Sequence, residues 1–228
     1  MILPTTRLVR QYDTHRLIPS RYREGGESVL ARIADDDAHL LAIFDLDHAT
    51  NDRLAAENGL LPGIGIDELV FGVPYYRIVN AAFCHAHPLG GRFNGPDRGV
   101  WYAAFELATA QAEIAFHKWV ELSEVGWLEE EEATYDDYLA DVSAELHDIR
   151  NDGRFADSLD PESYVASQGL ARELLEAGSL GIVYPSARRR KGTCLACFRP
   201  AIVANVRKGA TWMFRWEGIA KPSISAIT

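Results

Sequence analysis

The sequence is short of cysteine, of basic residues and of long apolar runs, and each shortage argues against a class of protein. Its 228 residues include only three cysteines, an odd number that cannot all pair within one chain, which favours a reducing compartment. Lysine and arginine number 23 against 33 aspartates and glutamates, a formal charge of −10, so a broad basic face for nucleic acid is not expected. No run approaches the ~18 apolar residues of a membrane span, and the N-terminus lacks the basic and apolar regions of a signal peptide. We therefore expect a cytoplasmic protein that binds neither nucleic acid nor a membrane.

What the sequence does contain is enough apolar surface for a sizeable core. Apolar residues make up 47% of the chain and charged residues 25%, which is ordinary for a globular protein. The length fits one large domain with an extension. We expect residues 1–66 to be a mostly helical N-terminal extension, with helices over 27–34 and 50–58. We expect residues 67–228 to form the main domain.

Within residues 67–228 the hydrophobic pattern predicts strands mixed with helices. Strands are expected at 73–79, 100–104, 181–184, 194–198 and 201–206. Helices are expected at 106–121 and 167–177, the second ending at Gly178 as a C-cap. Residues 122–165 are rich in acidic side chains, so we interpret them as a charged surface insertion with some strand and helix. The C-terminal tail contains Trp212, Phe214 and Trp216, which we expect to pack on the core.

Three polar residues stand at near-regular intervals between residues 90 and 113. Arg92, Tyr102 and Glu113 are separated by ten and eleven residues and fall on an expected loop, strand and helix. An arginine in a glycine-rich loop can grip a phosphate with its two-pronged guanidinium, and a tyrosine offers a face for a planar ring. A carboxylate among apolar neighbours can stabilise a developing cation. The competing interpretation is structural: Arg92 and Glu113 form an ion pair, and Tyr102 belongs to the core.

The motifs around these residues resemble the RES-domain family, which is named for its characteristic Arg, Glu and Ser. The resemblance rests on three blocks in the family's order, Gly90-Gly91-Arg92-Phe93-Asn94, Val100-Trp101-Tyr102-Ala103 and Thr109-Ala110-Gln111-Ala112-Glu113. Tyr76-Arg77-Ile78 is similar to the block that opens the domain. The family's serine matches Ser186, which follows Gly181-Ile182-Val183-Tyr184-Pro185; Ser179 is the alternative.

This resemblance implies a fold, a reaction and a partner. The fold is an α+β, ADP-ribosyltransferase-like mixed sheet with flanking helices. The family's substrate is NAD⁺ and no metal is required; members are toxins of type II toxin–antitoxin pairs, held inactive by an Xre-type antitoxin. Some members degrade NAD⁺ by hydrolysis or phosphorolysis, and others transfer ADP-ribose to a host protein.

The resemblance also assigns roles to individual residues. Arg92 and Tyr102 would hold and stack the nicotinamide half of NAD⁺, and Glu113 would stabilise the ribosyl cation. Ser186 would anchor a phosphate or the ribose. Arg77 and Asn94 are further candidates for dinucleotide binding, Arg77 through the diphosphate. A module that has kept the fold and lost catalysis is the alternative from another class.

Other groupings have simpler interpretations. Cys194 and Cys197 match C-x-x-C without a second pair, which is weak support for zinc or redox chemistry, and buried free cysteines are common. His85 and His87 lack an evident carboxylate partner, so we expect no metal site there. The basic run 188–191 either borders the pocket or is a solvated loop.

Overall fold

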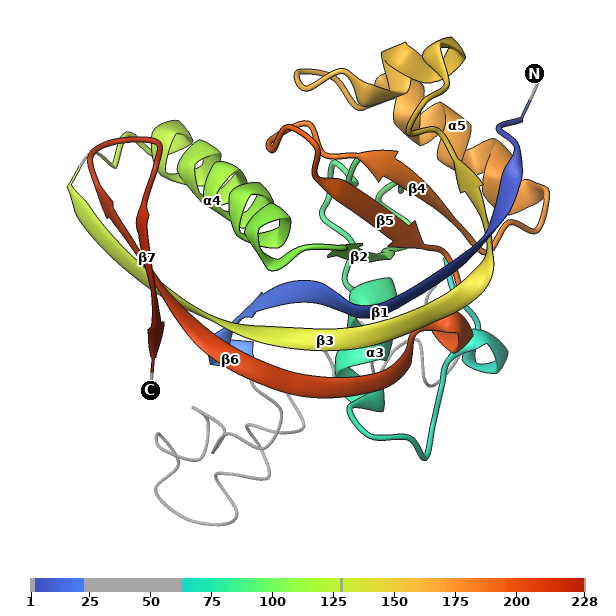
Figure 1. Ribbon diagram of the computed structural model, residues 1–228, viewed down its shortest axis with the longest axis horizontal. Coiled ribbons are helices and arrows are strands. Elements are labelled where there is room, and N and C mark those ends of the chain that lie inside the picture. The colour runs from blue at the N-terminus through green and yellow to red at the C-terminus, as the bar shows by residue number, and fades with distance from the viewer. Residues whose placement is uncertain (1–2, 23–62, 128, 228) are drawn as a thin grey trace.

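The structure, a computed structural model, describes residues 3–22, 63–127 and 129–227. Its centre is a seven-stranded mixed sheet in the order β1-β2-β5-β4-β3-β6-β7, with β1 also paired to β3 (Figure 1). The strands are β1 (Thr6–Pro19), β2 (Trp101–Ala104), β3 (Glu130–Asp148), β4 (Gly181–Pro185), β5 (Thr193–Cys197), β6 (Ala204–Glu217) and β7 (Ser223–Ile227). The helices are α3 (Tyr76–Cys84), α4 (Leu107–Glu124) and α5 (Val165–Glu176), with short 3₁₀ segments at Ser20–Tyr22, Ile66–Glu68, Gly153–Leu159 and Pro200–Ile202.

Three long strands form a curved ribbon, and three short strands continue from it. β3 pairs antiparallel with both β1 and β6, and the β1–β3 register runs from Thr6↔His147 to Pro19↔Tyr135. β3 is parallel only to β4, through His147↔Ile182 and Asp148↔Val183. β1 touches β2 at one antiparallel pair, His15↔Ala104. The expected α+β fold with a mixed sheet is confirmed, and it is compatible with an ADP-ribosyltransferase-like arrangement.

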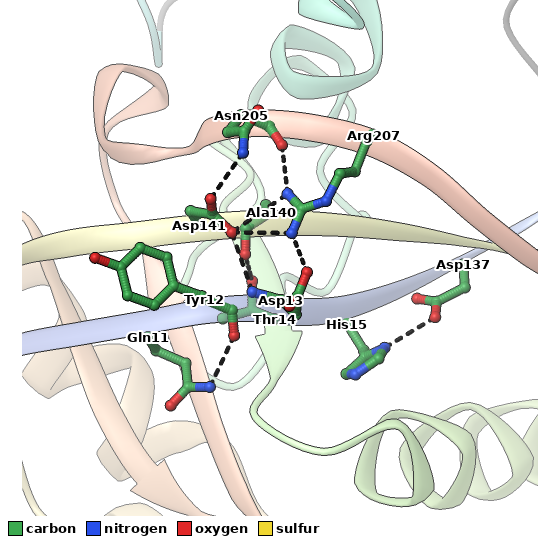
Figure 2. Close-up of polar contacts among 10 residues, drawn as sticks. All are labelled: Gln11, Tyr12, Asp13, Thr14, His15, Asp137, Ala140, Asp141, Asn205 and Arg207. Atoms are coloured by element: carbon green, nitrogen blue, oxygen red, sulfur yellow. Dashed lines mark hydrogen bonds and ion pairs between the residues drawn. The ribbon is translucent and has the colours of Figure 1, made fainter.

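A β-bulge bends β1 in the middle of the ribbon. The β1–β3 register shifts between Gln11 and Thr14, and Asp13 has a left-handed φ of 53°. Figure 2 shows the polar contacts that hold the bulge: Asp141 Oδ1 accepts the Asp13 amide hydrogen at 3.0 Å, and the Arg207 guanidinium contacts both carboxylates. A bulge of this kind increases local twist, which fits the curvature of the ribbon.

The sheet is covered on both faces. Because successive strand residues point to opposite faces, Val183 and Leu195 pack in the core with α3, whereas Ile182 and Ala196 pack with α4 and α5. Figure 1 shows α4 and α5 on the same side of the sheet. The tail aromatics join this second core: Phe214 and Trp216 are fully buried and Trp212 partly so.

Two sequence predictions, for residues 73–79 and for residues 122–165, differ from the structure. The strand expected over 73–79 is instead the start of α3, which begins at Tyr76 after Tyr75 adopts a left-handed conformation. Ile78, Val79, Ala82 and Phe83 are buried at helical spacing, and the run of aromatic and β-branched residues concealed that period.

The second error is the acidic insertion expected over 122–165. Its central part is β3, which pairs with three other strands. Ala140, Val142, Ala144 and Leu146 are buried there, a period of two that the intervening acidic residues masked. The acidic residues 129–132 themselves are exposed or half-buried, as expected.

The remaining predictions differ in outcome. The strands at 100–104, 181–184 and 194–198 and the helices at 106–121 and 167–177 are confirmed within a few residues, and Gly178 has the left-handed φ of 75° typical of a residue just past a helix end. The strand expected at 201–206 begins only at Ala204. In segment 1–66, residues 6–19 are a strand, and the helices expected at 27–34 and 50–58 lie outside the described residues. Among the described helices, none is both long and apolar enough to cross a membrane.

Candidate functional site

The hydroxyl of Tyr102 fastens the glycine-rich loop to β2. It accepts a hydrogen bond from the Phe93 amide at 2.7 Å and donates one to Asn94 Oδ1 at 2.8 Å. Burial raises the pKa of Tyr102 well above its usual range, so the phenol remains a neutral donor. Gly91 lies against this contact: a Cβ there would come within 2.6 Å of Asn94 Oδ1 and 2.8 Å of the Tyr102 hydroxyl. We call this set of hydrogen bonds among Tyr102, Phe93 and Asn94, closed over Gly91, the tyrosine clasp.

The side chain of Asn94 belongs to the clasp. Besides accepting from Tyr102, it donates from Nδ2 to the carbonyl oxygens of Gly95 at 2.7 Å and Arg98 at 3.0 Å. Asn94 is buried, and its oxygen and nitrogen both have partners within the loop. The geometry therefore gives Asn94 a part in shaping the loop.

Arg92, next to the clasp, is a buried arginine held by carbonyl oxygens. Its Nη1 donates to Asp160 O at 2.8 Å and Ser158 O at 3.3 Å, and its guanidinium lies 4.7 Å from the centre of the Tyr164 ring. No carboxylate among the described residues forms an ion pair with Arg92, so the Arg92–Glu113 pair considered from the sequence is not present there. No local pattern points to Tyr164, because this contact joins residues 92 and 164, which are far apart in the chain.

Glu113 is held by Ser186. The Ser186 hydroxyl donates to Glu113 Oε1 at 2.6 Å and itself accepts the backbone N–H groups of Arg188 at 3.1 Å and Arg189 at 2.9 Å. With two donors directed at its oxygen, the hydroxyl hydrogen is committed to the carboxylate. The structure thus joins α4 to the loop after β4 through two residues that the sequence singled out.

Two further residues complete the surroundings of Glu113. The Cys194 thiol on β5 lies 3.7 Å from Glu113 Oε1, and burial, reinforced by the Glu113 charge, raises the pKa of this thiol. The serine alternative, Ser179, instead hydrogen-bonds to the backbone of Gly181. Of the two serines considered, Ser186 is therefore the one in contact with Glu113.

His117, one turn after Glu113 on α4, lies close to both parts of the site. Burial lowers the pKa of His117; the Glu113 charge opposes this shift, and the charges of Arg188 and Arg92 add to it. Glu113, Arg92 and Arg188 are therefore within electrostatic reach of one imidazole. The Phe93 and Tyr184 rings, 4.7 Å apart, pack between the clasp and β4. Arg92 and Glu113 thus both act on the charge of His117, although they do not pair with each other.

The basic loop contacts the site through its first arginines. The Arg188 guanidinium lies 3.3 Å from the centre of the Phe116 ring and donates to Pro161 O at 2.9 Å, while Arg189 donates to Thr109 Oγ1 at 3.1 Å. A groove of about 550 Å³ begins at Arg188 and follows the adjacent face of α4. Its other walls are residues 220–222 and Ile224 from the C-terminal hairpin. The first part of the basic run therefore borders the site, and Arg190 and Lys191 are exposed.

Arg77 lies elsewhere. It is an exposed residue in the first turn of α3, with its guanidinium 5.8 Å from the centre of the Tyr76 ring. α3, which carries Arg77, packs on the face of the sheet opposite to α4, which carries Glu113.

The described residues contain no group of three or more His, Cys, Asp or Glu side chains arranged to hold a metal ion. Cys194 and Cys197 are both free and buried, and they pack in the cores on opposite faces of the sheet. The C-x-x-C spacing therefore does not bring two thiols together. Cys84 is likewise buried.

Comparison with known proteins gives one family and a distant structural likeness. The family model described as the RES domain matches residues 70–217. No curated protein matches the sequence. Among solved structures, the crystal structure of the M. tuberculosis MbcT–MbcA toxin–antitoxin complex is similar at 11% identity and a TM-score of 0.49, over 90% of this chain and 85% of that chain.

Proposed function

The chain belongs to the RES-domain family, and from this premise we propose that it is the toxin of a type II toxin–antitoxin pair and consumes NAD⁺. The proposed reaction cleaves the bond between nicotinamide and ribose. The observation that carries the proposal is the Ser186–Glu113 hydrogen bond of 2.6 Å, in the same site as the buried cation Arg92. A carboxylate held beside fixed cationic groups suits a substrate with a cationic reacting centre and an anionic diphosphate.

In the proposed reaction the C1′–N bond of the nicotinamide riboside breaks, and its electron pair leaves with the ring nitrogen as neutral nicotinamide. The ribosyl centre becomes cationic, and the Glu113 carboxylate stabilises that charge through space. A water or phosphate oxygen then bonds to C1′ and, in the case of water, a proton is released. Because nicotinamide is already a fair leaving group, holding the ribose in position supplies much of the rate.

The other residues bind and orient the substrate in this proposal. Tyr102 keeps the loop of Arg92 in place, and the face of its half-buried ring stacks on the nicotinamide in this proposal. Arg92 faces the phosphate nearest the reacting ribose. Arg188 contacts the rest of the diphosphate; it is the one residue of this proposed site that also lines the groove along α4.

The proposed partner is an Xre-type antitoxin that covers this site, in a cytoplasmic setting, and NAD⁺ is the proposed substrate without a metal. Transfer of ADP-ribose to a host protein is the alternative acceptor. A binding module without catalysis is the alternative of another class. The products formed from NAD⁺, or their absence, distinguish degradation, transfer and binding without catalysis.

The test is incubation of the purified chain with NAD⁺, with and without phosphate, followed by identification of products by mass spectrometry. We expect nicotinamide together with ADP-ribose or its 1″-phosphate, and at least a ~100-fold slower reaction for Glu113→Gln. Glu121→Gln is the matched control, because Glu121 is an exposed glutamate on the same helix. Equal rates for the wild type and Glu113→Gln would overturn the assignment. Labelled ADP-ribose on a host protein would favour transfer, and no turnover in any condition would favour the binding module.

A further inference from the structure

A second, smaller pocket lies behind the tyrosine clasp. We propose that it binds a small inorganic oxyanion of the phosphate type around Arg16. Its volume is about 130 Å³, well below the ~300 Å³ at which sites for drug-sized ligands begin, so a dinucleotide does not fit. The lining residues are Arg16, Ala82, His85, Ala86, His87, Gly90, Gly91, Asn94, Gly99, Val100 and Tyr102. None of these residues is acidic, although the chain as a whole carries a formal charge of −10.

Arg16 is the cation of this pocket. Its Nη1 donates to Tyr102 O at 3.0 Å, and its guanidinium lies 4.8 Å from the centre of the Trp101 ring. Its Nε is buried and has no hydrogen-bond partner, and no carboxylate of the described residues pairs with it. Burial lowers the pKa of Arg16 to about 10, so the side chain is still charged at neutral pH. A buried cation without a counter-ion is costly, and an anion in the adjoining pocket would remove that cost.

Histidines on the other wall supply further donors. His87 Nδ1 lies 3.1 Å from the Leu89 amide, which donates to it, so the hydrogen of the neutral ring is on Nε2. His85 and His87 are both exposed at the rim. Arg16, His85, His87 and Tyr102 are the ionisable side chains that line the pocket.

The pocket is separate from the Glu113 site but shares the clasp with it. Arg16 belongs to β1, outside the residues matched by the family model, and it packs on Trp101, whose core is the one that includes α3. Gly91, Asn94 and Tyr102 line the pocket and also form the clasp. Since β1 and β2 meet at a single residue pair, an anion bound here would fasten β1 to the loop that carries Arg92.

The experiment measures binding of inorganic phosphate by isothermal titration calorimetry and by the rise of the melting temperature with phosphate, at constant ionic strength set with chloride. We expect saturable binding, weakened at least tenfold by Arg16→Gln. Arg10→Gln, an exposed arginine on the same strand, should stay within twofold of the wild type. His87→Gln provides a second test if Arg16→Gln fails to fold, and it should weaken binding.

Two comparisons locate the bound anion. Arg188→Gln and Glu113→Gln should bind phosphate as the wild type does, because neither residue lines this pocket. The proposal fails if Arg16→Gln binds phosphate normally, if Arg188→Gln loses it, or if ADP binds where phosphate does not. All of these readouts are independent of NAD⁺ turnover, so failure here leaves the proposed reaction to its own test.

Discussion

The Ser186 hydroxyl and the Glu113 carboxylate, 73 residues apart in sequence, meet at 2.6 Å. The Ser186 hydroxyl accepts hydrogen bonds from two backbone N–H groups of the basic loop and donates one to Glu113 Oε1. Cys194 approaches the same oxygen. Both described side-chain donors thus use Oε1, and Oε2 is the oxygen we expect to face the ribose. We therefore propose that Ser186 positions Glu113, and its anchoring of a phosphate or the ribose stays the alternative prediction.

Ser186→Ala should lower the turnover of NAD⁺ by about 10- to 100-fold, because small displacements of a catalytic group cost that much. The fall should be in kcat with KM nearly unchanged, since substrate contacts remain. Steady-state kinetics with Ser123→Ala as the control makes the comparison, because Ser123 is an exposed serine at the end of the same helix. A rise in KM at constant kcat would instead support an anchoring role for Ser186.

Tyr164 supports Arg92 with its ring, 4.7 Å from the guanidinium. Tyr164→Ala should raise the KM for NAD⁺ by about tenfold, because a cation–π contact contributes roughly 0.5–2 kcal/mol. Tyr164→Phe keeps the ring and should stay within about twofold of the wild type. If the two variants behave alike, the hydroxyl or the loop, and not the ring, is what matters.

The tyrosine clasp predicts a difference between two neighbouring glycines. Gly91→Ala places a Cβ against Asn94 and the Tyr102 hydroxyl, whereas a Cβ at Gly95 meets nothing within 4 Å. Breaking the clasp should cost about 2 kcal/mol of unfolding free energy, which corresponds to a melting temperature lower by ~4–8 °C for a domain of this size. Gly95→Ala should melt within about 1 °C of the wild type, a difference that differential scanning calorimetry resolves. Equal melting temperatures would mean that the loop accommodates a side chain at residue 91.

Acid sensitivity should depend on Glu68, whose carboxylate binds both Arg98 and Arg199. Burial alone would raise the pKa of Glu68, but the hydrogen bonds and charges of the two arginines outweigh it and lower the pKa below 4.5. The folded state therefore binds this proton less readily than the unfolded state. The stability from Glu68 is fully present above pH 4.5 and is lost as the pH falls through the folded pKa.

The measurement is the melting temperature of the wild type and Glu68→Gln between pH 3 and pH 7. Glu68→Gln should melt at a lower temperature than the wild type at pH 7, and this difference in melting temperature should become smaller below pH 4.5. A gap that stays constant across this range would show that the charge of Glu68 does not contribute.

The sequence was most informative where local pattern and site coincide. The strand with Tyr102, the helix with Glu113 and the strand before Ser186 each follow their period, and the contact between Glu113 and Ser186 agrees with their grouping. Two elements were missed for physical reasons. The helical face of α3 was hidden by aromatic and β-branched residues, and the inward positions of β3, such as Val142 and Leu146, were hidden by acidic neighbours facing away.

Contacts between distant segments were beyond any local pattern. Arg16 donates a hydrogen bond to Tyr102 O. Arg92 donates to the carbonyl oxygens of Ser158 and Asp160 and contacts the Tyr164 ring. Nothing in the immediate sequence of either arginine specifies those partners. The motifs grouped Arg77 and Asn94 with the site. In the fold Arg77 lies on α3, and the Asn94 side chain hydrogen-bonds within the glycine-rich loop.

The pairing of β1 with β3 sets an order of events during synthesis. β1 is made before the other described strands, but its partners on β3 run from Tyr135 to His147, so β1 cannot pair with them until more than a hundred further residues have been added. Ser186 is made later still, and without it Glu113 lacks its hydrogen-bond donor. Contacts this distant in sequence form slowly. Chains that have not yet reached residue 186 contain Arg92, Tyr102 and Glu113 without the hydrogen bond that holds the Glu113 carboxylate.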